Sequence, residues 1–212
     1  MSVLSNIQRD KIIAIVRGAK PEDVLRIATA VYEGGVKIIE VTMNSHNALS
    51  VIAQLSNAMG NHVLIGAGTV LNSSMAKEAI GAGAKFIISP SLDLKTIKIT
   101  KQLGAVSIPG AYTPTEILSA HSNGADIVKV FPAGTSAHYF RDLQGPFSHI
   151  PMMPTGGISL GNIREFYEAG GVAFGIGTAL VNTNLEVNQD YLKTLTAKAK
   201  QFVDLISPSN SN

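Results

Sequence analysis

Short apolar segments alternate with amphipathic segments along nearly the whole chain. The apolar segments consist mostly of Val, Ile, Ala and Phe, as expected for strands that are covered on both faces. We expect eight strands, at residues 11–17, 36–42, 63–69, 85–89, 106–109, 127–131, 152–155 and 173–177. This pattern is typical of a parallel sheet rather than of a sheet with one face in water.

The segments between the strands carry apolar residues at helical spacing. In residues 21–33, Val24, Ile27 and Val31 fall on one helical face, and Pro21 suits the first turn of a helix. Further helices are predicted at residues 47–59, 73–80, 92–103, 113–122, 137–143, 160–169 and 192–206.

Eight strand–helix units in 212 residues predict a single-domain (β/α)8 TIM barrel with about 26 residues per unit. We assign residues 1–206 to this barrel and expect a disordered tail at 207–212. A doubly wound open sheet is the alternative, because it shares the same alternation. The sequence has no break between domains and no G-x-G-x-x-G motif after the first strand, which favours the barrel.

The composition narrows the classes of function. Hydrophobic residues make up 45% of the chain and charged residues 15%, which indicates a well-buried core. A net charge of +2 gives no indication that the protein binds nucleic acid or a membrane surface. The chain has no cysteine, which excludes disulfides and fits a cytoplasmic protein. Residues 1–10 lack the apolar region of a signal peptide, and no apolar run is long enough to span a membrane.

A lysine interrupts one of the apolar strands. Lys129 lies in the middle of residues 127–131, with Ile127 and Phe131 on its face of the strand. An apolar pocket lowers the pKa of a lysine, and the neutral amine is a nucleophile towards carbonyl groups. The alternative is a structural lysine that is paired or reaches solvent.

Two more charges break the strand pattern. Glu40 lies in residues 36–42, on the same face as Ile38 and Thr42, and Arg17 ends the first strand. In a barrel, groups at the carboxyl ends of strands meet at one mouth. A carboxylate beside an amine can move the protons that imine chemistry requires, and an arginine fork suits a carboxylate or a phosphate. An ion-pair partner for Glu40 and a surface role for Arg17 are the alternatives.

Glycine-rich turns follow several strands. Gly156 and Gly157 follow the seventh strand, and Gly177 and Thr178 end the eighth. The loops after these two strands are the usual phosphate site of such barrels, so we expect a phosphate there rather than turns of structural importance alone. Thr69, at the end of the third strand, could donate to a substrate carboxylate. Pro90, after the fourth strand, is a candidate wall of the pocket, and the five histidines show no metal-ligand spacing.

Taken together, these phrases resemble the KHG/KDPG aldolases, which cleave 2-keto-3-deoxy-6-phosphogluconate or 4-hydroxy-2-oxoglutarate to pyruvate and an aldehyde. The resemblance runs from about residue 12 to residue 181. The motifs that carry it are Ile13-Ala-Ile-Val-Arg17, Glu40-Val-Thr42, Gly66-Ala-Gly-Thr-Val-Leu71, Ile88-Ser-Pro90, Pro109-Gly110, Thr113-Pro-Thr-Glu116, Val128-Lys-Val-Phe-Pro-Ala133, Gly145-Pro-Phe147 and Pro154-Thr-Gly-Gly-Ile158. The Lys-Val-Phe-Pro and Pro-Thr-Gly-Gly phrases are the specific part.

The resemblance implies a class I aldolase that uses no metal and no cofactor, is cytoplasmic and forms a homotrimer. Its small-molecule partner would be a keto acid or its phosphate. Lys129 would be the Schiff-base lysine and Glu40 the general acid/base, with Thr69 at the pyruvate carboxylate and Phe131 beside the imine. The phosphate would lie at the turns named above, Gly156, Gly157, Gly177 and Thr178.

One position departs from the pattern. Many members carry a carboxylate-binding arginine four residues after the glutamate, where this chain has Asn44. Related phosphogalactonate aldolases have asparagine there, so a 2-keto-3-deoxy-6-phosphogalactonate substrate is an alternative. We expect Arg17 to bind the substrate carboxylate or sugar hydroxyls instead. A phosphate-binding barrel enzyme without covalent catalysis, or a non-catalytic sensor of keto-acid phosphates, are the remaining alternatives.

Overall fold

The computed structural model describes residues 2–133 and 136–207 of the chain. The strands are β1 (Ile12–Val16), β2 (Ile38–Thr42), β3 (Leu64–Gly68), β4 (Phe86–Ile88), β5 (Val106–Ile108), β6 (Gly110–Ala111), β7 (Val128–Val130), β8 (Met152–Pro154) and β9 (Phe174–Ile176). The helices are α1 (Val3–Asp10), α2 (Pro21–Glu33), α3 (Ala48–Met59), α4 (Ser73–Gly81), α5 (Leu94–Gln102), α6 (Pro114–Ser122), α7 (Ala137–Phe147), α8 (Ile163–Glu168) and α9 (Gln189–Ile206). All eight predicted strands and all predicted helices overlap observed ones.

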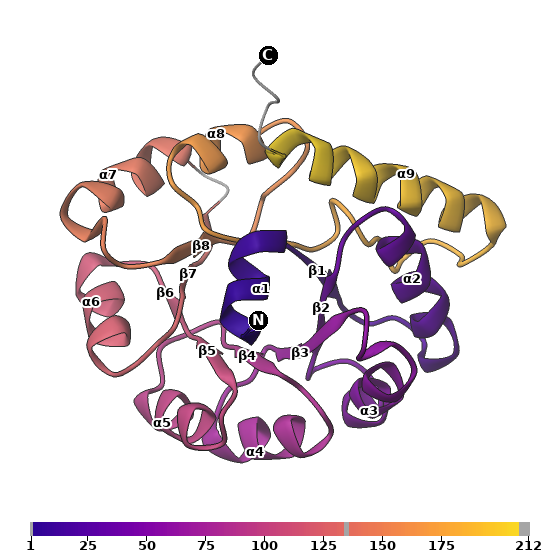
Figure 1. Cartoon of the computed structure of the whole chain (residues 1–212), viewed down its shortest axis with the longest axis horizontal. Coiled ribbons are helices and arrows are strands. Elements are labelled where there is room, and N and C mark those ends of the chain that lie inside the picture. The colour runs from indigo at the N-terminus through magenta and orange to yellow at the C-terminus, as the bar shows by residue number, and fades with distance from the viewer. Residues whose placement is uncertain (1, 134–135, 208–212) are drawn as a thin grey trace.

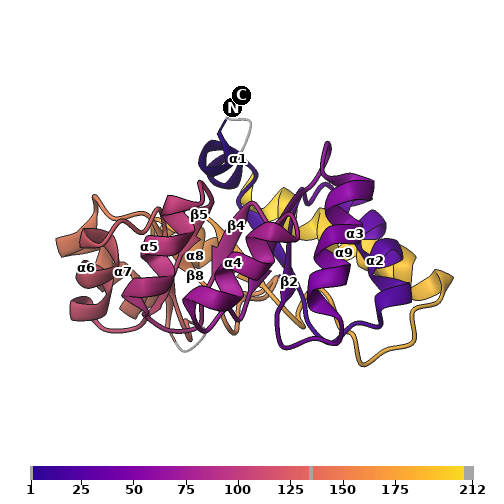
Figure 2. The same cartoon turned by 90° about the horizontal axis from the view of Figure 1, so that it is seen from below.

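The strands form a curled parallel sheet with helices on its outer side (Figure 1). One sheet has the order β5-β4-β3-β2-β1-β9, and a second has the order β6-β7-β8. Every strand pairing is parallel, as the sequence predicted. From the side, the sheet and its helices form a flat disc, from which α1 projects on one face (Figure 2).

The apolar core has two layers because both faces of the strands are covered. In β2, Ile39 belongs to the outer layer between strands and helices, whereas Ile38 belongs to an inner layer. The inner layer also contains Phe86, Ile108 and Met153 from other strands, all fully buried. This arrangement explains why the strands lack polar alternation.

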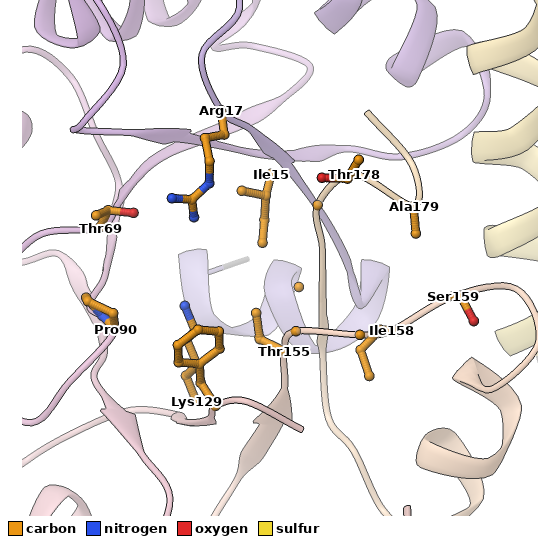
Figure 3. A pocket seen from close by; sticks show the side chains of 15 residues that line it. Ile15, Arg17, Thr69, Pro90, Lys129, Thr155, Ile158, Ser159, Thr178 and Ala179 are labelled. Atoms are coloured by element: carbon orange, nitrogen blue, oxygen red, sulfur yellow. The ribbon is translucent and has the colours of Figure 1, made fainter. Parts of the chain in front are cut away.

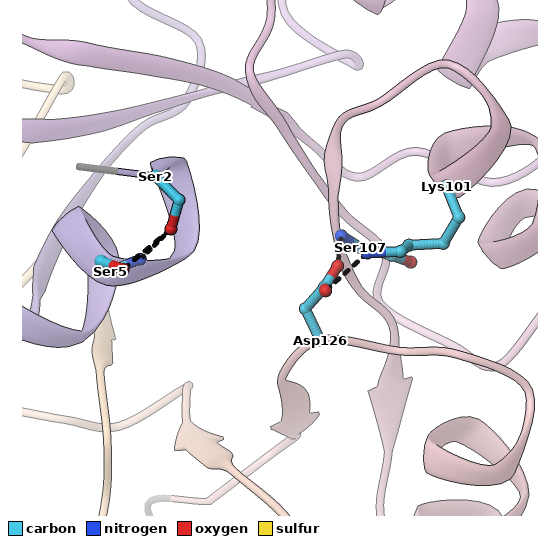
Figure 4. Close-up of polar contacts among 5 residues, drawn as sticks. All are labelled: Ser2, Ser5, Lys101, Ser107 and Asp126. Atoms are coloured by element: carbon cyan, nitrogen blue, oxygen red, sulfur yellow. Dashed lines mark hydrogen bonds and ion pairs between the residues drawn. The ribbon is translucent and has the colours of Figure 1, made fainter.

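Helix α1 was not predicted, because residues 1–10 were considered only as a possible signal peptide. The Ser2 hydroxyl caps the helix by accepting from the Ser5 N–H at 3.1 Å (Figure 4). Ile7 is fully buried in the inner layer, with Val3 and Leu4 packed against it. Because β1 begins only two residues after α1 ends, the helix covers the curled sheet where β1 begins. The spacing of Val3, Leu4 and Ile7 is the signal that indicates this helix.

The predicted strand 106–109 is divided in the structure. Pro109 separates β5 from β6, since proline has no N–H to donate to a neighbouring strand. Asp126 connects β5 to the segment before β7: it accepts from the Ser107 N–H at 2.8 Å and forms an ion pair with Lys101 at 2.5 Å (Figure 4).

The predicted C-terminal tail is described only at its first residue. Ser207 is the residue that follows the last turn of α9, and residues 208–212 of the predicted disordered tail lie outside the described residues. Among the described helices, none is both long enough and apolar enough to cross a membrane.

The inner-layer position of Ile7 generates a prediction. Ile7→Ala should lower the free energy of unfolding by about 2–5 kcal/mol, because it opens a cavity beneath the sheet. Leu103→Ala removes an aliphatic side chain that is 46% exposed, and should change it by less than about 0.5 kcal/mol. Urea unfolding measures both values, and equal losses would contradict the capping role of α1.

Candidate active site

A cavity of about 460 Å³ opens where the strands end. Its walls come from the ends of β1, β3, β4, β7, β8 and β9, so segments far apart in sequence meet around it (Figure 3). Most of the predicted site residues line it: Arg17, Thr69, Pro90, Lys129, Phe131, Gly156, Gly157, Gly177 and Thr178.

Lys129 projects into this cavity from the centre of β7 (Figure 3). Its side chain is buried, and Nζ lies 4.7 Å from the centre of the Phe131 ring. No carboxylate lies within ion-pair distance of Nζ in the described part of the chain. Burial lowers the pKa of Lys129; the Glu40 charge opposes this effect and the Arg17 charge adds to it. The amine is therefore more readily neutral than an ordinary lysine.

Glu40 lies on β2 and is not among the residues that line the cavity. It is 1% exposed, and its Oε2 atom has no hydrogen-bond partner among the described residues. Burial raises the pKa of the Glu40 carboxyl group, and the nearby charges of Lys129 and Arg17 act against that rise. A carboxyl group with a raised pKa holds a proton more readily than an ordinary glutamate, which suits it to proton transfer.

The neighbouring strand leaves room for this carboxyl group. Gly68 ends β3 opposite Thr42, and a Cβ atom at Gly68 would overlap Oε1 of Glu40. The glycine is therefore required by the close approach of the carboxyl group to the β3 backbone.

Arg17 follows β1, and its guanidinium group points into the cavity, towards the side from which Lys129 enters (Figure 3). The residue is exposed, and within the described ranges it forms no ion pair. Its charge is close enough to lower the pKa of both Glu40 and Lys129. An unpaired fork at the mouth of a cavity is suited to an anionic ligand.

Thr69 lies at the end of β3 with an unusual backbone conformation. Its φ of 55° is in the left-handed region, which costs a β-branched residue about 1–3 kcal/mol. The next residue, Val70, is fully buried and donates its N–H to the Ile88 carbonyl at 3.2 Å. The packing of Val70 thus holds Thr69 against the cavity.

The two glycine turns line the same cavity. Gly156 and Gly157 follow β8 with φ values of 86° and 77°, and Gly177 and Thr178 follow β9. The Gly157 N–H donates to no other of the described residues. A glycine turn with a free N–H group is suited to an anion such as phosphate.

Thr155 also lines the cavity, although it was not among the predicted site residues. Thr155 is buried, and its Oγ1 atom has no partner among the described residues. Gly175 leaves space for this hydroxyl group, because a Cβ there would lie only 2.6 Å from it. The signal was a polar residue at the end of an apolar strand, the same signal that identified Glu40.

Asn44, by contrast, is exposed on the loop after β2 and is not among the residues that line the cavity. Its role in substrate binding stays a prediction. No group of three or more His, Asp or Glu side chains within residues 2–133 and 136–207 is arranged as a metal site.

Comparison with known proteins gives a consistent result. The model of the KDPG and KHG aldolases matches residues 3–197. A 2-dehydro-3-deoxy-phosphogluconate aldolase of Treponema pallidum (strain Nichols) is 34% identical over 170 residues, which cover 78% of this chain and 80% of the relative. A probable 2-dehydro-3-deoxy-6-phosphogalactonate aldolase of Rhizobium meliloti (strain 1021) is 32% identical over 192 residues, which cover 88% and 90%.

Solved structures agree with these relatives. A native KDPGal structure has a TM-score of 0.85 and 29% identity, covering 92% of this chain and 93% of the other. The KDPG aldolase of Legionella pneumophila, solved with pyruvate captured at low pH as a covalent carbinolamine intermediate, has a TM-score of 0.74 and 26% identity, covering 92% of both chains.

The fit between Gly68 and Glu40 can be tested. Gly68→Ala should displace the Glu40 carboxyl group and lower any activity that depends on it, together with stability. Gly81→Ala is the matched control, because a Cβ at Gly81 meets nothing within 4 Å. The thermal unfolding midpoint should fall for Gly68→Ala, and less so in a Glu40→Ala background. An equal fall in both backgrounds would contradict the assigned contact.

Proposed function

This chain belongs to the KDPG and KHG aldolase family, and from that premise we propose that it is a class I aldolase whose Schiff base forms on Lys129. It cleaves 2-keto-3-deoxy-6-phosphogluconate to pyruvate and glyceraldehyde 3-phosphate, and 4-hydroxy-2-oxoglutarate to pyruvate and glyoxylate. The observation that carries the proposal is a buried lysine without an ion-pair partner on the cavity wall, close to a buried, unsatisfied carboxyl group.

Lys129 acts as the nucleophile. Its lowered pKa supplies neutral amine, which adds to the C2 ketone of the substrate. Loss of water from the carbinolamine gives a protonated imine, and this cation withdraws electrons from the C3–C4 bond. The carbinolamine captured in the Legionella pneumophila aldolase is an adduct of the same type.

Glu40 moves the protons. Its raised pKa allows it to alternate between carboxylate and carboxylic acid during a turnover. As a carboxylate it removes the C4 hydroxyl proton, the C3–C4 bond breaks, and the aldehyde leaves. The remaining enamine then takes a proton at C3, and water hydrolyses the resulting imine to pyruvate and free Lys129.

The other groups hold the substrate. We assign the substrate carboxylate that becomes the carboxylate of pyruvate to Thr69. Arg17 binds the same carboxylate or the sugar hydroxyls. The phosphate is assigned to the turns that contain Gly156, Gly157, Gly177 and Thr178, and the free Gly157 N–H group supports this assignment. Pro90 and Phe131 are the apolar walls beside the imine.

We also infer that the strands close into one eight-stranded barrel, with β5 and β6 as two parts of a single strand. β5 pairs with β4, and β6 pairs with β7. On the other side, Thr155 and Gly175 form a bridge between the ends of β8 and β9. Closure would bring Arg17, Glu40 and Lys129 to a common mouth.

The remaining properties follow from family membership. We propose a cytoplasmic homotrimer that needs no metal and no cofactor, and the mass of the protein in solution tests the assembly. Relatives acting on each of the two phosphorylated epimers, gluconate and galactonate, match this chain. The ratio of kcat/KM for the two epimers decides between them.

Borohydride trapping with pyruvate tests the proposed function. We expect a covalent pyruvate adduct on Lys129, detected by intact mass and peptide mapping. Lys129→Ala should form no adduct, and Lys98→Ala, which removes a lysine from α5, should form it like the wild type. Glu40→Gln should form the adduct but turn over about 10² to 10⁴ times more slowly.

No adduct from folded protein in excess pyruvate would refute the Schiff-base mechanism. Retained turnover without an adduct would indicate a phosphate-binding enzyme of another chemistry. A ligand-dependent rise in melting temperature without any turnover would indicate a sensor.

The charge of Arg17 generates a prediction on pH dependence. Because Arg17 lowers the pKa of Lys129, Arg17→Ala should raise it, so that less neutral amine is present at a given pH. The rise of the adduct-formation rate with pH should therefore move to higher pH. Arg141→Ala, at an exposed position on α7, should leave the profile unchanged. Identical profiles for all three proteins would contradict the electrostatic role of Arg17.

A further inference from the structure

The position of the Arg17 side chain depends on its backbone. The residue is exposed, and its guanidinium group points into the cavity although it forms no ion pair among the described residues (Figure 3). A long, flexible side chain without partners has many rotamers, so its reach is set largely by the peptide to which it is attached. The contacts of that peptide are therefore informative.

The peptide group between Arg17 and Gly18 is held on both sides. The Thr183 hydroxyl, on the loop after β9, donates to the Arg17 carbonyl at 2.7 Å. The Gly18 N–H donates to the Ser45 hydroxyl oxygen, on the loop after β2, at 2.8 Å. β2 and β9 are the two neighbours of β1 in the sheet, so side chains from the loops on both sides of β1 hold the two ends of one peptide group.

Gly18 itself is a conformational requirement. Its φ is 68°, and a Cβ there would meet nothing within 4 Å. A side chain would therefore fit at this position, and glycine is required because the turn after Arg17 has a left-handed backbone conformation. The turn directs the Gly18 N–H to Ser45.

Ser45 is fixed to the strand that carries Glu40. Its hydroxyl lies 2.9 Å from that of Thr42, and its N–H donates to the Thr42 carbonyl at 2.9 Å. Thr42 is fully buried, two residues beyond Glu40. The rigid end of β2 therefore serves as the anchor for the loop that follows β1.

We propose that Ser45 and Thr183 are positioning residues that clamp the Arg17–Gly18 peptide and so hold the guanidinium group of Arg17 over the cavity for the substrate. Neither residue lines the cavity, so both act through Arg17. The proposal rests on the proposed function, because it concerns the reaction at Lys129.

Steady-state kinetics with 2-keto-3-deoxy-6-phosphogluconate, or its galactonate epimer if that is the better substrate, tests the clamp. Thr183→Val and Ser45→Ala should each lower kcat/KM about five-fold, the equivalent of one hydrogen bond. The change should lie mainly in KM. Thr183→Ser keeps the hydroxyl group and should restore most of the lost kcat/KM.

A double-mutant cycle separates positioning from a general structural effect. In an Arg17→Ala background, neither Thr183→Val nor Ser45→Ala should lower kcat/KM further, because the group they position is gone. Thr194→Val is the matched control: its hydroxyl donates to the Asp190 carbonyl at 2.8 Å within α9, and its loss should leave the kinetics unchanged.

The clamp is refuted if both substitutions leave kcat/KM unchanged, or if they lower it equally with and without Arg17. It is also refuted if Arg17→Ala has wild-type kinetics. These failures are distinct from a failure of the proposed function, since borohydride trapping on Lys129 in the unsubstituted protein reports on that function alone.

Discussion

The burial of two ionisable groups, Lys129 and Glu40, is the constraint on which the rest of the structure depends. Each is removed from water without a direct ion pair, so each is shifted towards its neutral form. Burying a charged group costs free energy, and the burial of the two apolar layers around the strands offsets this cost. The inner layer, covered at one end by α1, keeps water away from the base of the site. A fold with strands covered on one face only would leave one of these two groups, or both, exposed to water.

Glycines on the inner side of the strands make room for the functional groups. Gly68 leaves space for the Glu40 carboxyl group, and Gly175 leaves space for the Thr155 hydroxyl. Gly66 has the same role for the ring of Phe86, deeper in the inner layer. At these positions glycine is selected by the volume of a neighbour rather than by φ. Glycine is thus required for two reasons. Within the strands it allows the close approach of a neighbouring side chain, and beyond their ends it allows a positive φ, as at Gly156.

The sequence predicted the strands, the helices and most of the residues that line the cavity, because burial on both faces leaves a pattern in which a single charge is conspicuous. Lys129, Glu40 and Arg17 were found in this way. It missed α1, whose apolar face has only three residues among polar ones, and Thr155, because a threonine in a strand is common. Contacts between distant segments leave no local pattern: Thr183 bonds to a carbonyl 166 residues away in the chain.

The side chains of the candidate site are held in place in two ways, depending on whether they lie in strands or in loops. Lys129 and Glu40 lie within strands, and their positions are fixed by the parallel pairing around them. Arg17 lies one residue beyond β1, where strand pairing no longer acts, and its peptide group is held by hydroxyl groups instead. The substrate contact proposed for Arg17 requires an exposed guanidinium group, and exposure removes the packing that would fix the side chain. Side-chain bonds to its backbone resolve this conflict, because they restrict the chain without covering the guanidinium group.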